Sequence, residues 1–438
     1  MVAVMEGTRS IVTDIFRDAL AAVDPGRIVA PHAAGLIERY RRERFTRLVV
    51  MGFGKAAYPM ALAVENACGD LAEVTGTVIV PHGHAGQDLR RVSVVEAGHP
   101  LPDANGVTGT EELVRLALQA DERTLVLTLI SGGGSALLVS PAAGITLQQK
   151  QAATDLLLKA GAEIGELNAV RKHLSRVKGG RLAALLHRAA TVSLIISDVI
   201  GDRLDVIASG PTSPDPSTYA DAFAVIERYG LRRHLPGDVV RLLREGMSGL
   251  LAETPKPGDP VFHGVENRLV ATNRIALAEA RRSAAARGLR GEIVVADLAG
   301  PARDAGRMLA GKALSSLRER RNELPLCLIS GGETTVKVTG TGKGGRNQEL
   351  ALAFAREIEG IEGITFLSGG TDGCDGPTDA AGAVVDGTTV TLARRQGLDP
   401  DSFLDRNDSH TFFQRAGGLL VTGPTGTNVM DMQIAVIG

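Results

Sequence analysis

A lysine stands inside a glycine turn near the start of the chain, in the stretch LVVMGFGKAAYPMALA (residues 48–63). The apolar run before the turn predicts a strand, and the residues after it predict a helix. Gly52, Gly54 and Ala57 match the dinucleotide-binding pattern G-x-G-x-x-G/A. Lys55 would place a cation at the start of the helix, where anions already bind favourably. The turn therefore indicates either a nicotinamide cofactor or a bound phosphate or carboxylate.

The nicotinamide interpretation needs an acidic residue at the end of the second strand, where it would hold the ribose. That strand is contained in GTVIVPHGHAG and ends in Pro81 and His82. The nearest acids, Glu65, Asp70 and Glu73, precede it. The pattern is incomplete at the position that selects the cofactor, so we favour the anion-binding interpretation of Lys55.

A second basic stretch, ELNAVRKHLSRVKGGRLA, covers residues 166–183. Arg171, Ser175 and Lys178 are spaced four and three residues apart, which puts them on one face of a helix. Such a face could hold a phosphate or a carboxylate. A solvated basic face explains the same residues equally well, so both interpretations stay open.

Two groups of carboxylates are candidates for metal binding or proton transfer. Asp198 directly follows the apolar run SLIIS, at the expected tip of a strand, where it could hold Mg²⁺ or accept a proton. The loop 367–386 adds Asp372, Asp375 and Asp379 on glycine turns. Mg²⁺ needs only one or two carboxylates beside phosphate oxygens and water. Asp198 and Asp372 are our candidate metal ligands.

Glycine-rich loops supply the remaining candidates. Three predicted strands end in Ser-Gly-Gly, within residues 129–138, 328–336 and 366–373. Glycine there lets backbone N–H groups point at a ligand beyond the strand. The stretch TGTGKGG (339–345) precedes Arg346 but is not a Walker A loop, which needs Gly-Lys-Ser/Thr. The candidate substrate- or nucleotide-binding residues in these loops and the first turn are Gly54, Ser131, Gly132, Gly133, Gly134, Ser135, Gly331, Gly332, Glu333, Gly344, Gly345 and Asn347.

Strands alternate with helices along most of the 438 residues, which predicts parallel sheets covered by helices on both faces. A chain of this length favours two domains. We expect the proline-containing stretch LAETPKPGDPVFHGVEN to be the linker, with a boundary near residue 255. The prediction is an N-terminal, doubly wound, Rossmann-like domain over 1–255, joined by a C-terminal strand over 428–438. A smaller α/β domain covers 256–427.

Composition excludes several classes of protein. The net charge is −2 and aromatic residues make up 3%, so neither a duplex-binding surface nor a base-stacking platform is expected. No run of about 18 apolar residues predicts a membrane span. The N-terminal stretch reads as an amphipathic helix, not a signal peptide. Three scattered cysteines, Cys68, Cys327 and Cys374, fit a reducing cytosol, so we expect a cytoplasmic protein.

Seven stretches together resemble one family, the glycerate 2-kinases that carry a MOFRL domain. They are GFGKAAYPMA, LISGGGSALL, LNAVRKHLSRVKGGRLA, SDVIGD with SGPTSPD, SGGETTVKVTGTGKGGRNQE, SGGTDGCDGPTDAAGA and TGPTGTNVMDMQI. The resemblance runs from about residue 10 to the end of the chain. Some members of this family were formerly labelled hydroxypyruvate reductases.

The resemblance implies ATP-dependent phosphorylation of D-glycerate at O2, in a cleft between two α/β domains. It implies that Lys55 and Arg346 hold the glycerate carboxylate and the transferring phosphoryl group, in either order. Asp198 is the third candidate catalytic residue, as a ligand of Mg²⁺ or as a base; both roles stay open. ATP and Mg²⁺ are the expected cofactors, and a homodimer is an assembly that the sequence allows.

Two other functions are compatible with parts of the sequence. An NAD(P)H-dependent hydroxypyruvate reductase would use the first glycine turn, although the acid after the second strand is absent. A non-catalytic sensor of sugar acids or nucleotides would use the same binding residues without turnover.

Overall fold

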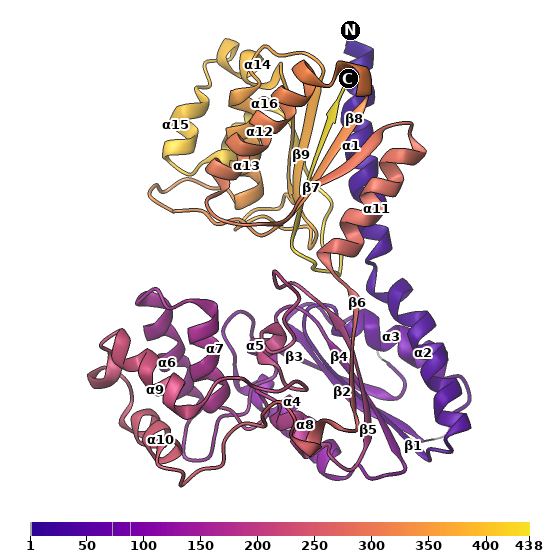
Figure 1. Ribbon diagram of the computed structural model, residues 1–438, viewed down its shortest axis with the longest axis vertical. Helices are drawn as coiled ribbons and strands as arrows, with labels where there is room; N and C mark the ends of the chain where they lie inside the picture. The colour runs from indigo at the N-terminus through magenta and orange to yellow at the C-terminus, as the bar shows by residue number, and fades with distance from the viewer. Residues whose placement is uncertain (1, 72, 88) are drawn as a thin grey trace. The chain divides into compact units, whose positions relative to one another are not determined.

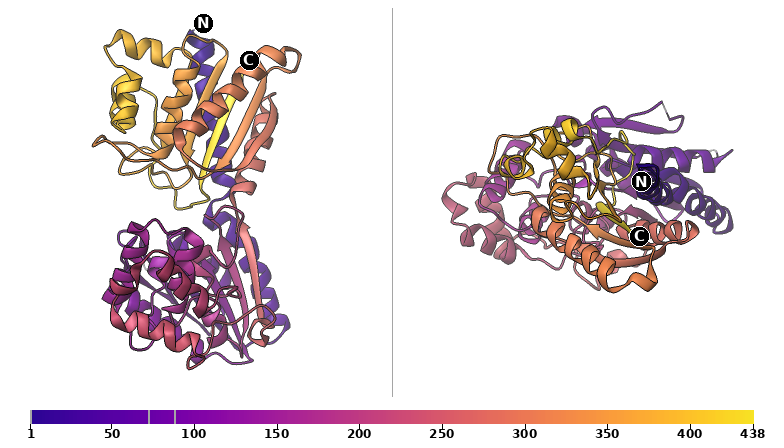
Figure 2. Two further views of the ribbon diagram at one scale, coloured as in Figure 1. Left: turned by 60° about the vertical axis from the view of Figure 1, so that its left-hand side comes forward. Right: turned by 90° about the horizontal axis from the view of Figure 1, so that it is seen from above.

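The computed structural model describes residues 2–71, 73–87 and 89–438 (Figure 1). The chain forms two compact units, and one of them is built from both ends of the sequence. Unit 1 comprises Met1–Asp24 and Ala271–Gly438, and unit 2 comprises Pro25–Val270. The two termini of the chain therefore belong to the same unit (Figure 2).

Unit 2 is built on a six-stranded sheet with the strand order β3-β2-β1-β4-β5-β6. The pairs β1–β2, β1–β4, β2–β3 and β4–β5 are parallel. In chain order its strands and helices are α2 (Pro25–Arg42), β1 (Arg47–Phe53), α3 (Ala57–Cys68), β2 (Val74–Pro81), β3 (Val92–Ala97), α4 (Ala104–Leu118), β4 (Thr124–Ile130), α5 (Gly134–Leu137), α6 (Leu147–Lys159), α7 (Ile164–His173), α8 (Arg181–Leu185), β5 (Ala190–Ile196), α9 (Tyr219–Arg228), α10 (Gly237–Met247) and β6 (Val265–Ala271).

Helices cover both faces of this sheet, as its apolar strands require. All seven residues of β4, TLVLTLI, are buried, which is typical of a central parallel strand with no solvated face. Helix α3, backed by α2, lies over β1 and β2, and α4 packs on β2 and β3 (Figure 1). Helices α6, α7, α9 and α10 bury a separate apolar cluster that includes Leu157, Val170 and Leu243. The doubly wound, mostly parallel sheet expected from the sequence is confirmed.

Unit 1 contains a second six-stranded sheet, with the order β11-β10-β9-β12-β8-β7. It is mixed, because β12 is antiparallel to both β8 and β9 whereas β7 is parallel to β8. In chain order its strands and helices are α1 (Val2–Ala22), α11 (Asn273–Ala286), β7 (Arg290–Leu298), α12 (Ala302–Glu319), β8 (Leu326–Gly332), α13 (Arg346–Glu357), β9 (Ile364–Gly370), β10 (Gly382–Asp386), α14 (Thr389–Arg395), α15 (Pro400–Asp405), α16 (Ser409–Ala416), β11 (Leu419–Leu420) and β12 (Asp431–Ile437).

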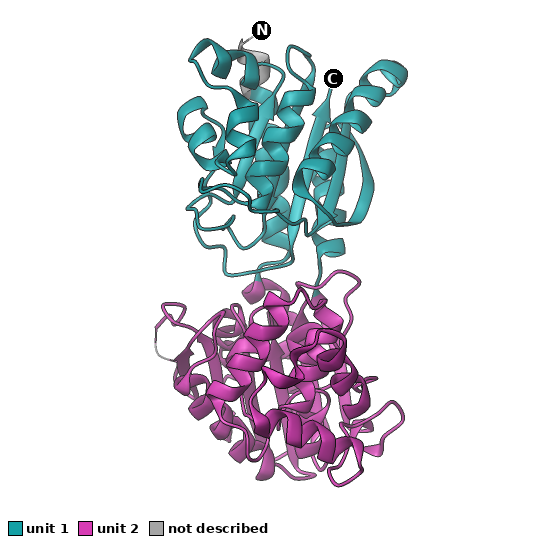
Figure 3. Cartoon of the chain, turned by 90° about the vertical axis from the view of Figure 1, so that its left-hand side faces the viewer, with its two compact units in different colours: residues 1–24, 271–438 teal, residues 25–270 magenta. Residues whose placement is uncertain are grey.

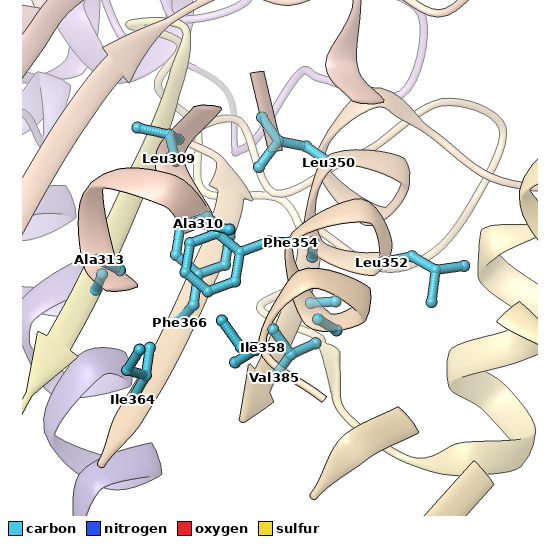
Figure 4. Packing of buried hydrophobic residues seen from close by; sticks show 14 of the residues in the cluster. Leu309, Ala310, Ala313, Leu350, Leu352, Phe354, Ile358, Ile364, Phe366 and Val385 are labelled. Carbon is cyan, nitrogen blue, oxygen red and sulfur yellow. The ribbon is translucent and has the colours of Figure 1, made fainter. Parts of the chain in front are cut away.

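The core of unit 1 lies between this sheet and α12 and α13. Phe354 of α13 stacks on Phe366 of β9, with ring centroids 3.8 Å apart (Figure 4). Leu350 of the same helix and Ile358, which directly follows the helix, are fully buried in this cluster, one turn to either side of Phe354. Because the apolar face of α13 packs in this core, the position of its first residue, Arg346, is fixed.

Helix α1 closes the opposite face of the same sheet, far from its neighbours in sequence. It packs on α11, β9 and β12. Its residues up to Asp24 belong to unit 1, which is teal in Figure 3. Phe16 is fully buried, and a Cβ atom on Gly369 of β9 would lie 3.0 Å from its ring. The prediction of a domain 1–255 is therefore wrong at its start, because residues up to Asp24 belong with the C-terminal part of the chain. The amphipathic pattern predicted the helix but not its partner.

The other predicted boundaries are also corrected. Strand β12 lies inside the unit 1 sheet, so the expected return of 428–438 to the first domain is wrong, as is the smaller domain's range of 256–427. The proline-containing stretch is a packed part of unit 2, where Thr254 donates a hydrogen bond to Asp215 (3.0 Å). Strand β6 then joins the unit 2 sheet. Prolines and weak periodicity do not distinguish a linker from an irregular packed segment.

Two strands of unit 1, β10 and β11, were not predicted from the sequence. β10 lies in a glycine-rich segment, and β11 has only two residues. Among the described residues, no helix is long and apolar enough to cross a membrane.

We expect Phe16→Ala to destabilise unit 1 by about 3–5 kcal/mol, because it removes a fully buried aromatic side chain. Hydrogen exchange should then accelerate at the amides of β9 and β12, while those of β1 and β4 in unit 2 keep their rates. Arg17→Ala, at an exposed position of the same helix, is the matched control. Equal acceleration in both units would contradict the assignment of α1 to unit 1.

Candidate active site

The turn that carries Lys55 joins β1 to α3 in unit 2, and its backbone donors are already used. The N–H groups of Gly54, Lys55 and Ala56 donate to Ile79 O (3.1 Å), Gly132 O (2.8 Å) and Ser131 Oγ (3.0 Å). In a dinucleotide-binding turn, the corresponding N–H groups face the pyrophosphate. The geometry therefore gives no support to a nicotinamide cofactor at this turn.

The Ser131–Gly134 loop follows β4 and lies against the Lys55 turn, because β1 and β4 are neighbours in the sheet. Gly54 has φ +130°, and a Cβ atom there would lie 2.2 Å from Ser131 Oγ, so only glycine fits. A Cβ atom on Gly133 would contact the ring of His99 (3.0 Å) and Lys55 Cγ (3.5 Å). The structure thus brings Gly54, Lys55 and the Ser-Gly-Gly loop into one group, to which His99 also belongs.

His99 faces this group from the loop after β3. Burial lowers the pKa of His99, and the positive charges of Lys55 and His84 lower it further. A neutral imidazole beside Lys55 leaves the lysine as the cation of the group.

Arg171 and Lys178 converge on the same loop. Lys178 Nζ donates to Ser135 O (2.9 Å), and Arg171 Nη2 donates to the same oxygen (3.2 Å). Lys178 is completely buried. The prediction that these residues share one helix face is wrong, because α7 ends at His173 and both Ser175 and Lys178 lie beyond it. Ser175 bonds Ser140 O instead.

A strained segment also reaches this loop, and the sequence analysis missed it. Ala208 and Ser209 adopt left-handed φ angles of 50° and 63°, which cost energy in residues other than glycine. Ser209 Oγ lies 2.8 Å from Ser135 Oγ and donates to Asn168 Oδ1 (3.1 Å). Strain of this kind concentrates at functional sites. The only signal in the sequence was the motif SGPTSPD that follows.

Asp198 follows the end of β5, as predicted, and is half-buried. The neighbouring acid Asp215 has a structural role, because it is completely buried and accepts hydrogen bonds from Lys172 (3.1 Å), Ser217 and Thr254.

Arg346 is the first residue of α13 in unit 1, and two carboxylates hold its guanidinium. Nε and Nη2 donate to the two oxygens of Asp431 at 2.5 and 2.9 Å, and Nη1 lies 2.7 Å from Glu333 Oε1. Burial alone would lower the pKa of Arg346, but the bonds and charge of Asp431 raise it above its ordinary value. Arg346 is therefore a fixed cation at the carboxyl end of the sheet. Asp431 went unnoticed in the sequence because it opens an ordinary apolar strand.

Asp375 holds the N-terminus of the same helix. Its carboxylate accepts hydrogen bonds from the backbone N–H groups of Asn347 (3.0 Å) and Gln348 (2.8 Å). A Cβ atom on Gly345 would lie 2.3 Å from Asp375 Cγ, so glycine lets the carboxylate approach. Burial raises the pKa of Asp375 to about 6, against the opposing effect of these N–H groups. The side chain of Asn347, predicted to bind substrate, is buried and accepts from Ser368 Oγ (2.7 Å).

The glycine-rich stretch before Arg346 is explained largely by packing. The N–H groups of Gly340, Gly342 and Lys343 donate to Asn407 Oδ1, Arg406 O and Asp408 Oδ1. A Cβ atom on Gly344 would lie 2.3 Å from Ser409 Oγ.

The Ser-Gly-Gly residues at 330–332 end β8 and pair with β12, so they form no open loop. A Cβ atom on Gly331 would lie 2.1 Å from Asn273 Oδ1, and one on Gly332 would lie 2.2 Å from Leu298 O. Close packing accounts for both glycines.

Asp372, the candidate metal ligand of unit 1, lies near Asp431. Its Oδ1 and that of Asp431 would lie 3.3 and 3.5 Å from a Cβ atom on Gly370, so the two carboxylates are close together. Within the described ranges of the chain, no cluster of three or more metal-ligating side chains is present. One or two carboxylates completed by nucleotide oxygens and water match what Mg²⁺ requires.

The fold and these sites define a two-unit α/β protein with fixed cations at the carboxyl ends of its strands. Comparison with known proteins specifies it further. Residues 11–244 match a family described as a domain of unknown function (DUF4147), and residues 326–431 match the MOFRL family.

The chain is 42% identical to the D-glycerate 2-kinase of Thermotoga maritima, with 99% of each chain covered. A crystal structure titled as glycerate kinase from that organism superposes with a TM-score of 0.90, covering 99% of this chain and 100% of that one. Glycerate 2-kinase of Pyrococcus horikoshii is 41% identical over 98% of this chain and 97% of its own. An Agrobacterium vitis relative, provisionally named a hydroxypyruvate reductase, is 43% identical over 98% of this chain and 94% of its own. The chain therefore belongs to the glycerate kinase family that carries the MOFRL domain.

Gly345→Ala should destabilise unit 1 by about 1–3 kcal/mol, because the added methyl group overlaps Asp375 and displaces the helix cap. Gly311→Ala, in α12 with no atom near its Cβ position, is the control and should stabilise by about 0.5–1 kcal/mol. Urea denaturation followed by circular dichroism measures both. Equal stability of the Gly345→Ala variant and the parent would contradict the close packing.

The raised pKa of Asp375 predicts a pH dependence. Its ordinary value is 3.8 and its folded value is about 6, so its contribution to stability is complete below pH 3.8 and lost as the pH rises through 6. The unfolding free energy of the parent relative to Asp375→Asn should fall by about 2.5 kcal/mol between pH 4 and 7. Asp379→Asn, at an exposed position in the same loop, is the control. A pH-independent difference for Asp375→Asn would refute this assignment.

Proposed function

We propose that this protein phosphorylates D-glycerate at O2 with ATP and releases 2-phosphoglycerate. The observation that carries the proposal is the identity of 42% over 99% of the chain to a D-glycerate 2-kinase. The structure supports it through cations that are fixed by their surroundings in each unit. Phosphoryl transfer is catalysed mainly by positioning and by stabilising negative charge on the transferring group.

In the proposed reaction, unit 2 contributes Lys55 and unit 1 contributes Arg346. Lys55 is held in a turn whose N–H groups are all bonded, and Arg346 is held by Asp431 and Glu333. Both cations are thus positioned before substrate arrives, which reduces the cost of reorganisation in the transition state. One of them would bind the glycerate carboxylate and the other the transferring phosphoryl group.

Arg171, Lys178 and the Ser131–Ser135 loop would bind phosphate or carboxylate groups in unit 2. Ser135 is the centre of this proposed subsite, because both cations donate to its carbonyl oxygen. Gly344 and Gly345 would shape the backbone next to Arg346. Gly331, Gly332 and Asn347 would act through packing.

Mg²⁺ is the proposed metal cofactor. Asp372, with Asp431 beside it, would hold the ion in unit 1, and Asp198 is the proposed ligand in unit 2. When bound, the ion neutralises charge on the nucleotide phosphates. Asp198 could instead accept the proton of the O2 hydroxyl, and its position after β5 is compatible with either role.

Hydroxypyruvate reduction is the competing proposal, favoured by the name of the Agrobacterium vitis relative. The bonded N–H groups of the first turn argue against it, as does the absence of an acid at the end of β2.

A cytoplasmic location remains our expectation. The thiols of Cys68 and Cys327 are buried and that of Cys374 is exposed, and scattered thiols of this kind suit a reducing compartment. A homodimer remains a prediction from sequence.

Lys55→Met and Arg346→Lys should each lower kcat by about 10²–10³ or more, because each removes positioned charge or bidentate binding. Lysine at position 346 keeps a charge beside buried Asp431, so the fold should survive. Lys159→Met and Arg356→Lys, at exposed positions, are the controls. Turnover is measured with ATP, Mg²⁺ and D-glycerate, and ³¹P NMR identifies the product.

Near-parental turnover in both site variants would contradict these roles. Oxidation of NADH in the presence of hydroxypyruvate, without phosphorylation of glycerate, would refute the proposed kinase activity and support hydroxypyruvate reduction.

A further inference from the structure

A small cavity opens in unit 2 between helix α10 and the segment that follows α7, and its volume is about 280 Å³. Its lining comes from the loop 142–145, the segment 173–181, the first residue of α9, one side of α10 and residues 251–252. None of the residues assigned above to phosphoryl transfer lines it. Helix α10 also lies apart from α5, the helix that starts at Gly134 (Figure 1). The cavity is therefore separate from the site around that loop.

Much of the cavity wall is apolar. Ile145, Leu242 and Leu251 contribute aliphatic groups, and the ring of Tyr219 forms another part of the wall. Tyr219 packs against the buried ring of His173, with ring centroids 4.5 Å apart, so its position is fixed. An apolar wall with a few placed polar groups is usual for a small-molecule site.

Three arginines also line the cavity, and they differ in their counter-charges. Arg241 pairs with Asp238 (2.7 Å) and Glu245 (3.8 Å), which are the two acids of the lining. Within the part of the chain that the structure describes, no carboxylate lies within 4.0 Å of the guanidinium groups of Arg176 and Arg181. The acids of the cavity are thus used by one arginine, and two positive charges are left.

Glu253 follows the cavity residues in the sequence, and it is used elsewhere. Its carboxylate is bonded by His173 Nε2 (3.1 Å) and by the N–H group of Tyr219 (2.8 Å). Burial lowers the pKa of His173, so the imidazole is neutral at neutral pH. The cavity therefore keeps the positive charges of Arg176 and Arg181.

The hydrogen bonds of Arg181 are incomplete. Its Nη2 donates to Tyr219 Oη (3.2 Å) and, at the longer distance of 3.4 Å, to Ala252 O. Its Nε is buried and has no hydrogen-bond partner among the described residues. An unmade hydrogen bond of a buried charged group is costly. A carboxylate bonds two neighbouring nitrogens of one guanidinium, so a bound acid would supply the missing acceptor.

We propose that this cavity binds a small organic acid that has one carboxylate and an apolar body. The carboxylate bonds Arg181 and Arg176, and the apolar body lies against Ile145 and Leu242. The guanidinium of Arg181 turns toward the ligand as its long bond to Ala252 O is released. An inorganic phosphate would leave the apolar wall uncovered, and a neutral ligand would leave the charge unpaired. The proposal goes beyond the kinase function and does not rest on it, because no residue of that site lines the cavity.

Isothermal titration of the full chain with benzoate at neutral pH tests the proposal. Benzoate has the required carboxylate and apolar body, and benzamide is a neutral compound of similar shape. Benzoate should bind saturably, and benzamide should bind about tenfold more weakly or less, because it lacks the charge-assisted hydrogen bonds. Absence of saturable benzoate binding, or equal affinity for the two compounds, would overturn the proposal.

Arg176→Met and Arg181→Met locate the site, and each should lower benzoate affinity about tenfold or more. Arg176 is exposed, so its variant should keep the melting temperature of the parent. This variant decides the question if the loss of Arg181 unfolds the protein. Arg188→Met, at an exposed position of the same unit, is the matched control and should bind benzoate like the parent. Unchanged benzoate affinity in the Arg176→Met variant would refute the proposed site.

Competition with D-glycerate separates this cavity from the substrate site of the proposed kinase, because both ligands are carboxylates. D-glycerate at concentrations that saturate phosphorylation should leave benzoate bound. Displacement of benzoate by D-glycerate would place benzoate at the substrate site and overturn the proposal. Benzoate binding that depends on Arg176, in a protein that does not phosphorylate glycerate, would refute the proposed function and retain the cavity as a binding site.

Discussion

The ion pair between Arg346 and Asp431 is the interaction on which the site in unit 1 depends. It joins the first residue of α13 to the first residue of β12, which are 85 positions apart in the sequence. The buried aspartate needs the guanidinium, and the guanidinium needs the aspartate to keep its direction. Asp375 adds a second restraint by holding the N-terminus of the same helix. Two carboxylates from distant segments thus fix one cation.

Unit 2 also holds its site in place, through contacts between two turns. There the turns after β1 and β4 interlock through Gly54 and Ser131, because their strands are neighbours in a parallel sheet. Backbone N–H groups are used to fix the turns, so lysine and arginine side chains remain to interact with anions. This explains how a turn can match a dinucleotide pattern and yet offer no donors for a dinucleotide.

The sequence predicted the elements that have strong local signals. Apolar runs that alternate with helical segments predicted the strands β1, β2, β4, β5, β8 and β9. Glycine turns identified Lys55 and Arg346 as candidate site residues. The sequence could not predict contacts that depend on long-range packing, such as the ion pair of Arg346 with Asp431 and the hydrogen bonds of Asp375 to the start of α13. The predicted domain boundaries were wrong for the same reason. An amphipathic pattern indicates that one face of a helix is buried, but not which part of the chain covers that face.

The assembly of unit 1 from both ends of the sequence has a consequence during synthesis. Helix α1 is made early, yet the elements on which it packs, α11, β9 and β12, come from the second half of the sequence. Strand β12, which lies between β8 and β9, is made last. Unit 2 can complete its own sheet during translation, while the apolar face of α1 stays exposed until its partners in unit 1 are made. Chaperone contact with this helix, and degradation of chains that stop before β12, are the natural outcomes of such an arrangement.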